Sequence, residues 1–425
     1  MSALFDQGGV RQGRARKENE RRGARQRGGG LMRKVAKLGI ILLAGLIMFV
    51  IAYSFAFKGL SDRVIMLGLG IDLLTETGEY EVTAEVIVPG AGSSQEGGTG
   101  GSGSRLVRGK GETVSLAVDD IYQHYGKTPS LGECSILVIG EEAAKNSDLR
   151  QLLGYFYASD AFKDGTVTLM CEGKASELFD VQTTMDSYVT FTLLSIVLNN
   201  SDTTTVPFTE LHNIMEKQGT PSQCFYLNCI KTIETAGDSE KQDEQSEKPA
   251  VKLDASTLGV FKANRFAGVL SEEATRGMCL MTKPKIFDVF IVDAESESFY
   301  LPEKTTVGLT QKSCGIEPEF ENGRATATIK ISSRVKRMRT DTLGELQGFQ
   351  PYTYREFGEE ALVQVKEQMT TLCLAALEEA SEIDGDYLQI NNLFYKKYGK
   401  KWLEFLGDRS VYDVVQFKTD ITVKN

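Results

Sequence analysis

The chain has 425 residues, and its 48 Lys and Arg side chains stand against 58 Asp and Glu, so its formal net charge is −10. The acidic balance argues against nucleic acid as a partner, and the length suffices for two or three domains of usual size. The charge is unevenly distributed, because residues 1–37 contain 11 basic and only 3 acidic side chains. The remainder of the chain is therefore more acidic than the total suggests.

An uncharged apolar stretch, residues 38–57, follows this basic arm directly. As a helix, its 20 residues reach about 30 Å, the thickness of the hydrocarbon core of a bilayer. Basic flanks of a membrane span stay in the cytoplasm. We therefore predict a single-pass membrane protein with residues 1–37 as a basic cytoplasmic arm, residues 38–57 as a transmembrane helix, and an extracytoplasmic remainder.

The alternative reading of the same stretch is a cleaved signal peptide, with Ser54-Phe55-Ala56 as a small-x-small cleavage site. The apolar run is longer than the usual core of a signal peptide, and the basic arm in front of it is long. These two features favour the uncleaved anchor.

The segment 58–175 alternates predicted strands with predicted helices, which is typical of an α/β or α+β domain. A Gly/Ser-rich loop at residues 90–104 interrupts it and cannot hold a packed core. Apolar runs and alternation predict strands at 64–71, 80–88, 105–109, 135–139 and 165–171, and helices after Thr113 and over 141–157.

Residues 176–235 form a second predicted domain, which is mostly helical. Helices are expected at about 183–199 and 208–218, followed by an apolar stretch at 224–233. Residues 236–250 are polar, highly charged and poor in apolar side chains. This composition predicts a linker between domains.

The last predicted domain covers residues 251–425 and contains long strands. Residues 325–337 alternate, so that Ala325, Ile329 and Val335 share one face, and residues 411–423 repeat the pattern. Between them, a stripe of apolar side chains at helical spacing predicts a long helix, and a second helix is expected at about 386–398. We predict an α+β domain in which long antiparallel strands pack on this helix pair.

The cysteine and histidine content gives little support to metal or disulfide chemistry. The 7 Cys residues are scattered and odd in number, which favours buried thiols, although an exported region could oxidise them. With 2 His residues and no Cys-x-x-Cys pair, the usual zinc ligand sets are missing. Cys224 and Cys229 lie five residues apart, so in a strand they would face opposite sides. We expect no cofactor and no metal.

Two short segments resemble motifs of phosphate binding or catalysis, but each lacks features that the motif requires. Gly68-Leu-Gly70-Ile-Asp72 lacks the third glycine and the following helix of a phosphate loop, so it predicts a tight bend in a strand. Ser333 and Lys336 have the spacing of a Ser-x-x-Lys motif but lie in a predicted strand, where they face opposite ways. We interpret the protein as non-enzymatic.

Three pairs of adjacent carboxylates are the remaining acidic motifs. In helices such pairs usually mark N-terminal turns or solvated faces rather than acid–base couples. The pairs are Glu141-Glu142, Glu272-Glu273 and Glu359-Glu360.

Taken in order, several short motifs resemble the Ger(x)C family, the C subunit of spore germinant receptors in endospore-forming bacteria. Each motif alone is weak, but their order and spacing across residues 62–425 are specific. The motifs are Gly68-Leu-Gly70-Ile71-Asp72, Tyr80-Glu-Val-Thr83, Leu137-Val138-Ile139-Gly140-Glu141-Glu142, Val260-Phe261-Lys262, Glu272-Glu273-Ala-Thr-Arg276-Gly277, Ile316-Glu-Pro-Glu319 with Asn322-Gly323, and Tyr398 to Trp402 before the final strand.

The resemblance implies a three-domain α+β protein on the outer face of the spore's inner membrane. It further implies that the protein acts with membrane-embedded A- and B-type receptor subunits in nutrient-triggered germination. The sequence does not identify the germinant small molecule. The family is not known as enzymatic. Its members are usually lipoproteins with a lipid-modified Cys after the apolar stretch, whereas the first Cys here is Cys134. The span at 38–57 stands where that lipid is expected.

The shared Glu272-Glu273-x-x-Arg276-Gly277 element is the candidate interaction surface. On a helix, Arg276 can pair with Glu272 one turn away, and Gly140 and Gly277 are expected to end elements where a Cβ would clash. Two other functions stay open: a membrane-tethered solute-binding sensor, and a hydrolase of the cell envelope that uses scattered carboxylates.

Overall fold

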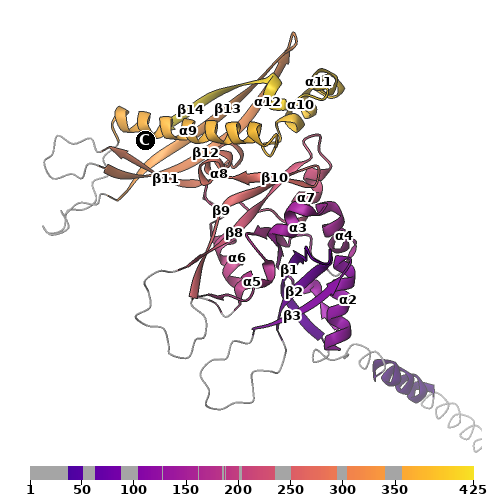
Figure 1. The fold of residues 1–425 in the computed structure, drawn as a ribbon. Helices are drawn as coiled ribbons and strands as arrows, with labels where there is room; N and C mark the ends of the chain where they lie inside the picture. The colour runs from indigo at the N-terminus through magenta and orange to yellow at the C-terminus, as the bar shows by residue number, and fades with distance from the viewer. Residues whose placement is uncertain are drawn as a thin grey trace, which may run out of the picture. The chain divides into compact units, whose positions relative to one another are not determined.

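The computed structural model describes residues 37–50, 63–87, 104–126, 128–160, 162–183, 186, 188–200, 203–234, 250–293, 304–339 and 357–425. The chain divides into two units, Met1–Asp62 and Arg63–Asn425. The second unit holds two β-sheets and their covering helices (Figure 1), so the predicted α+β class is confirmed.

The first unit contains a helix over residues 37–50, whose large apolar side chains are exposed. The arm at 1–36 and residues 51–57 of the predicted span lie outside the described residues. Among the residues that are described, no helix combines the length and apolarity needed to cross a bilayer.

The larger sheet is mixed, with a parallel centre and antiparallel edges. Its strand order is β10-β9-β8-β6-β5-β1-β2-β3, with β4 beside β1 and β7 beside β9. Strands β1, β5, β6 and β8 run parallel, and the pairs on either side are antiparallel. The strands are β1 (Arg63–Leu73), β2 (Tyr80–Ile87), β3 (Ser104–Gly111), β4 (Thr128–Ser130), β5 (Ile136–Ile139), β6 (Val167–Cys171), β7 (Gln182–Thr183), β8 (Cys224–Glu234), β9 (Ala250–Lys262) and β10 (Arg265–Leu270).

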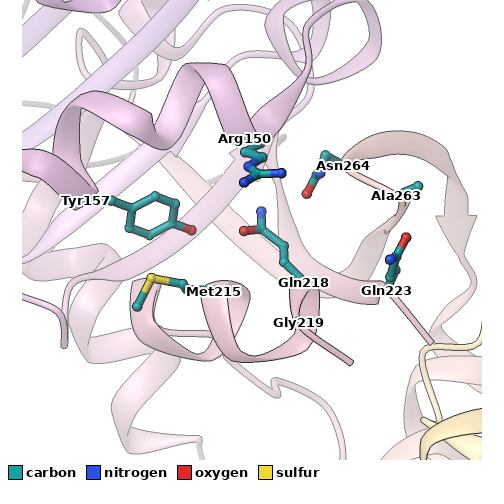
Figure 2. Close-up of a pocket in the computed structure, with 8 residues that line it drawn as sticks. All are labelled: Arg150, Tyr157, Met215, Gln218, Gly219, Gln223, Ala263 and Asn264. Atoms are coloured by element: carbon teal, nitrogen blue, oxygen red, sulfur yellow. The ribbon is translucent and has the colours of Figure 1, made fainter. Parts of the chain in front are cut away.

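Helices cover both faces of the larger sheet. The apolar side chains buried beneath them form two clusters. Strand β5 is buried at all four positions, as a central parallel strand should be. A cavity lies between α4 (Leu149–Ala158), α7 (Leu211–Gln218) and the β9–β10 turn, and we call it the α4–α7 cavity (Figure 2). The helices are α2 (Val114–Tyr125), α3 (Glu141–Asn146), α4 (Leu149–Ala158), α5 (Ala175–Leu178), α6 (Val189–Asn199) and α7 (Leu211–Gln218), with a short 3-10 turn at Leu131–Glu133.

The smaller sheet has the order β11-β12-β13-β14. Its strands are β11 (Phe287–Asp293), β12 (Lys304–Glu321), β13 (Arg324–Arg339) and β14 (Val415–Lys424). Asn322 and Gly323, both with positive φ, make the two-residue turn from β12 to β13, where such residues are preferred. The predicted antiparallel pairing holds for β11, β12 and β13, but β14 pairs with β13 in parallel.

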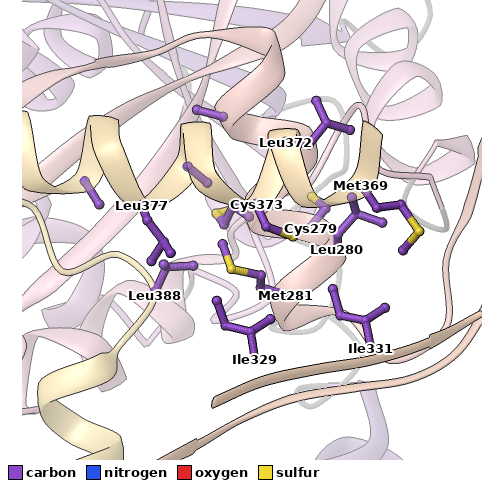
Figure 3. Close-up of a cluster of buried hydrophobic side chains, with 14 of the residues drawn as sticks. Cys279, Leu280, Met281, Ile329, Ile331, Met369, Leu372, Cys373, Leu377 and Leu388 are labelled. Atoms are coloured by element: carbon purple, nitrogen blue, oxygen red, sulfur yellow. The ribbon is translucent and has the colours of Figure 1, made fainter. Parts of the chain in front are cut away.

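The predicted burial of β13 is confirmed, because every second residue from Ala325 to Val335 is buried. These side chains pack on α8 and α9, whose apolar stripes meet over the sheet (Figure 3). The helices of this region are α8 (Glu272–Thr282), α9 (Glu359–Glu382), α10 (Ile390–Tyr398), α11 (Lys400–Leu406) and α12 (Val411–Val414).

A hydrogen-bonded junction joins the larger sheet to the helices after α9. The buried Asp386 carboxylate accepts hydrogen bonds from Ser222 Oγ (2.6 Å) and from the backbone N–H groups of Ile390 (2.7 Å) and Asn391 (2.8 Å). Gln389 Nε2 donates to the carbonyl oxygen of Cys224 at the start of β8 (2.6 Å). The carboxylate therefore holds the first turn of α10 against the segment that leads into β8.

Several local predictions differ from the structure in ways that have physical reasons. The helix predicted at 141–157 is broken into α3 and α4, because Asp148 accepts a hydrogen bond from Arg150 N and starts a new helix. The final strand begins at Val415, after the short helix α12. Residues 235–249 and most of the loop at 90–104 lie outside the described residues. Strands β8 and β9, on either side of the predicted linker, are neighbours in one sheet, and the domain boundaries stay a prediction.

Candidate functional site

The two glutamates of the candidate surface form the first turn of α8, and both are exposed. The helix begins at Ser271, whose Oγ accepts a hydrogen bond from Ala274 N (3.1 Å). Ser271 is itself held by α9, because its backbone N–H donates to Glu379 Oε2 (2.9 Å). Carboxylates stabilise a helix N-terminus through the helix dipole. The first turn of α8 therefore presents two exposed carboxylates in a fixed position. The same N-terminal location is found for the other two carboxylate pairs, as predicted.

The predicted pair between Arg276 and Glu272 is wrong. Arg276 Nη2 lies 2.9 Å from Asp288 Oδ1 and donates to the carbonyl oxygen of Val289 (3.1 Å). Its guanidinium also lies 5.5 Å from the ring centroid of Phe290. Asp288 is nearly buried, so its charge requires this partner. Arg276 therefore fastens α8 to β11 instead of extending the acidic surface.

Gly277 does not end a helix, which corrects the prediction, but it does lie where a Cβ would clash. It sits inside α8, and a Cβ added there would meet the carbonyl oxygen of Leu372 at 1.9 Å. The glycine allows the backbones of α8 and α9 to approach closely. The four candidate residues thus divide into an exposed acidic pair and two packing residues, the half-buried Arg276 and the buried Gly277.

A groove of about 590 Å³ lies beside these packing residues, between β11 and α9. Strand β11 is an edge strand. Two glutamines of α9 form hydrogen bonds with some of the backbone groups on its free edge. Gln364 Oε1 accepts from Asp293 N (2.9 Å), and Gln368 Nε2 donates to the carbonyl oxygen of Ile291 (2.7 Å). Helix α9 therefore protects part of an edge that would otherwise pair with another chain.

The Gly68-x-Gly70-x-Asp72 element is a packing motif of β1. A Cβ at Gly70 would meet Ala175 Cβ at 2.8 Å, so the glycine gives α5 room against the strand. The Asp72 carboxylate accepts hydrogen bonds from the backbone N–H groups of Ala175 (2.7 Å) and Ser176 (2.9 Å). Burial raises the pKa of Asp72, while these hydrogen bonds oppose the rise. The element holds the start of α5, and both oxygens of the Asp72 carboxylate take part in this contact.

The family element around Gly140 serves the same packing, as does Glu85 of β2. Gly140 precedes α3, and a Cβ there would meet Asp72 Oδ1 at 2.1 Å, so it ends β5 where a side chain would clash, as predicted. Glu141 Oε2 accepts from the backbone N–H of Gly173 (2.9 Å). On β2, Glu85 accepts from the N–H groups of Val189 and Thr190 at the start of α6, both at 2.9 Å. Strand carboxylates thus cap two helices on this sheet.

The predicted burial of the thiols is found for most of them. All 7 Cys residues are described as free thiols, and six of them are buried. Cys224 belongs to the core around α8 and α9, whereas Cys229 belongs to the core on one face of the larger sheet, so the two face opposite ways as predicted. In the described part of the chain, no group of three or more His, Cys, Asp and Glu side chains is placed to bind a metal ion.

Fold and sequence together define a two-sheet α+β protein, and comparison with known proteins gives its family. The family model described as the spore germination protein N-terminal domain matches residues 57–232. The model described as spore germination B3/GerAC like, C-terminal, matches residues 256–424. The chain belongs to this GerAC-like, or Ger(x)C, family of spore germination proteins, and the resemblance seen in the sequence is confirmed.

The crystal structure of the GerBC protein is similar to this chain at 15% sequence identity, covering 84% of this chain and 96% of that chain, with a TM-score of 0.48. No curated protein matches the chain by sequence.

The residues of the α4–α7 cavity were missed by sequence reasoning. They come from α4, α7 and two turns that are far apart in the chain, so no local motif joins them. One signal was available: Ala263-Asn264 lies between two apolar runs, as a two-residue hairpin turn would.

Proposed function

We propose that the protein is the non-enzymatic C component of a spore germinant receptor, required for nutrient-triggered germination through contacts with membrane-embedded A- and B-type subunits. The observation that carries this proposal is the order of the two family matches, which together span most of residues 57–424. The buried acidic groups support it, because Asp72, Glu85 and Asp386 are engaged in capping helices.

We further propose that residues 38–57 anchor the chain in the spore's inner membrane, with the folded unit on its outer face. The support is the charge asymmetry of the flanks and the helical, exposed apolar residues at 37–50. The anchor would replace the lipid of related lipoproteins, since Cys134 is the first Cys in the chain.

Removing residues 1–57 tests this anchor. The shortened protein should leave the membrane fraction and appear in the soluble fraction, because no other stretch of the sequence is uncharged over a comparable length. Replacing residues 38–57 by an unrelated apolar span should restore sedimentation with membranes. Continued sedimentation of the shortened protein in cells that lack the A- and B-type subunits would contradict the proposal.

The exposed pair Glu272 and Glu273 is our proposed contact for a partner subunit, while Arg276 and Gly277 support it from beneath. The pair lies on a helix start that Ser271 and Glu379 hold in place, so its charge is presented in a fixed position. A fixed charge contributes to partner choice and association rate more than a mobile one.

The contact is tested by the double substitution Glu272→Lys and Glu273→Lys, with co-purification of A- and B-type subunits as the readout. Recovery should fall roughly tenfold, because charge reversal at an interface turns attraction into repulsion. The matched control is Glu359→Lys with Glu360→Lys, an exposed pair in the first turn of α9 that suffers the same helix-dipole penalty. Equal losses in both variants would place the contact elsewhere.

Gene deletion tests the function as a whole. Spores that lack this chain should fail to germinate with the nutrient of the cognate receptor, and they should still germinate with stimuli that bypass nutrient receptors. Normal nutrient germination after deletion, in a strain without a second copy of the gene, would overturn the proposed role.

A further inference from the structure

The α4–α7 cavity has the size of a small-molecule site and a lining that is mostly apolar, with a few polar side chains. Its volume is about 450 Å³, within the range of about 300–1,000 Å³ that ligand pockets occupy. Residues from α4, α7, the segment before β8 and the β9–β10 turn line it, and Figure 2 shows their side chains around one common space.

Three polar atoms on the lining side chains are shielded from solvent and lack a hydrogen-bond partner among the described residues. They are Tyr157 Oη, Gln218 Nε2 and Asn264 Oδ1. Buried polar groups in native proteins are almost always paired. These three atoms around one cavity therefore offer hydrogen-bonding capacity that a bound polar molecule can use.

The backbone around the cavity has positive φ angles at three residues. Ala263 and Asn264, with φ angles of 46° and 67°, form the two-residue β9–β10 turn, which requires such angles, and Gln223 has a φ of 45°. Hydrogen bonds hold these conformations, from Ala263 N to the carbonyl oxygen of Gln223 (2.8 Å) and from Leu149 N to that of Asn264 (3.0 Å). The turn therefore holds Asn264 in a fixed position at the cavity.

The charge at the cavity comes from Arg150, in the first turn of α4. Its side chain is exposed, it lines the cavity, and its guanidinium makes no ion pair within the described part of the chain. In Figure 2 the guanidinium lies above the Gln218 amide, with the Tyr157 hydroxyl beside them. An arginine with free donors is suited to a carboxylate, which it can bind through two parallel hydrogen bonds.

We propose that this cavity binds a small carboxylic acid that also carries a hydroxyl or amino donor and a short apolar side chain. The carboxylate would accept hydrogen bonds from Arg150, Gln218 Nε2 and Tyr157 Oη, and the donor would reach Asn264 Oδ1. The apolar part would pack on Met215 and the ring of Tyr157. Such binding would occur whether or not the protein assembles with membrane subunits.

Four related compounds separate the parts of this proposal when each is titrated into the full-length protein in detergent by calorimetry. Leucine and its hydroxy analogue, leucic acid, contain all the required groups. Isocaproate lacks the donor, and leucinamide lacks the carboxylate. We expect leucine, leucic acid or both to bind, and isocaproate and leucinamide to bind at least about tenfold more weakly, since each loses one charged or hydrogen-bonded contact.

Substitutions at the cavity show whether binding occurs there. Arg150→Ala should weaken binding at least about tenfold, whereas Arg265→Ala, an exposed arginine outside the lining, should leave it unchanged. Asn264→Gly should also weaken binding without disturbing the turn, because glycine adopts a positive φ freely.

Tyr157→Phe distinguishes a ligand site from a packing defect. Removing an unpaired hydroxyl should raise the melting temperature of the unliganded protein, and it should lower the affinity for the ligand. A role in packing alone would leave the affinity unchanged. The proposal is overturned if neither leucine nor leucic acid binds at about 10 mM, if isocaproate or leucinamide binds equally well, or if Arg150→Ala has no effect.

Discussion

At the scale of single residues, the fold uses buried carboxylates to hold helix starts. Asp386 is the clearest example, since it accepts hydrogen bonds from Ser222, Ile390 and Asn391 while it is shielded from water. Burial raises its pKa to about 6, although the hydrogen bonds oppose the rise. The free carboxyl of Asp has a pKa near 3.9, so folding favours the protonated form of this group.

The stability of the protein should therefore depend on pH through the protonation of Asp386. Its contribution to the free energy of unfolding is largest below about pH 4, falls as the pH rises through about 6, and is constant above that. Between about pH 4.5 and pH 7 the loss amounts to about 2 kcal/mol.

The substitution Asp386→Asn isolates this contribution. Urea unfolding at the two pH values should show that the wild-type protein loses about 2 kcal/mol more stability than the variant does on going to pH 7. Asp408→Asn, an exposed carboxyl in the same region, controls for the loss of one negative charge. An equal pH dependence in wild type and Asp386→Asn would contradict the assignment.

At the scale of elements, helix packing decides the role of Gly277. Within α8 it faces the carbonyl oxygen of Leu372 on α9, and a Cβ would come within 1.9 Å of that oxygen. Gly154, in α4, also lies inside a helix, but nothing is within 4 Å of its Cβ position. The two glycines therefore give opposite expectations for the same substitution.

Gly277→Ala should lower the free energy of unfolding by about 1–3 kcal/mol, because α8 and α9 must separate to admit the methyl group. Gly154→Ala should raise it by about 0.5–1 kcal/mol, since alanine loses less backbone entropy in a helix. Thermal unfolding of the two variants and the wild-type protein measures whether each substitution lowers or raises the stability. A neutral Gly277→Ala would mean that the helices adjust their spacing freely.

Elements with a clear local pattern could be predicted from the sequence, whereas their long-range pairing could not. The alternation over 325–335 and the glutamates at the starts of α3, α8 and α9 were confirmed, because burial on one face and the helix dipole act within a few residues. The parallel partner of β14 and the true partner of Arg276 depend on segments far away in the chain. The α4–α7 cavity was missed for the same reason.

At the scale of the folded unit, Arg63–Asn425, the two sheets share a hydrophobic core. Cys224, Leu258 and Val260 of the larger sheet belong to the same buried cluster as α8, α9 and the smaller sheet. The junction at Asp386 and Gln389 adds hydrogen bonds between these regions. We expect that residues before and after the predicted linker at 236–250 unfold together.

The one tryptophan in the chain makes this expectation measurable. Trp402 is buried, stacks on Phe394 and donates its indole N–H to Asn391 Oδ1 (2.8 Å). Its fluorescence reports the C-terminal region, while far-ultraviolet circular dichroism reports the whole unit. The two signals should give the same midpoint in urea. Separate midpoints would instead support independent N-terminal and C-terminal domains.

The buried thiols of the folded unit have a practical consequence for studying its motions. Burial raises the pKa of Cys134, Cys279 and Cys373 to about 12, so these thiols hold little thiolate for alkylation while the protein is closed. Cys134 lies in the core of the larger sheet, and the other two lie between α8 and α9. Mass spectrometry of alkylated peptides would thus time the opening of each core separately, without any introduced label, and could do so inside intact spores.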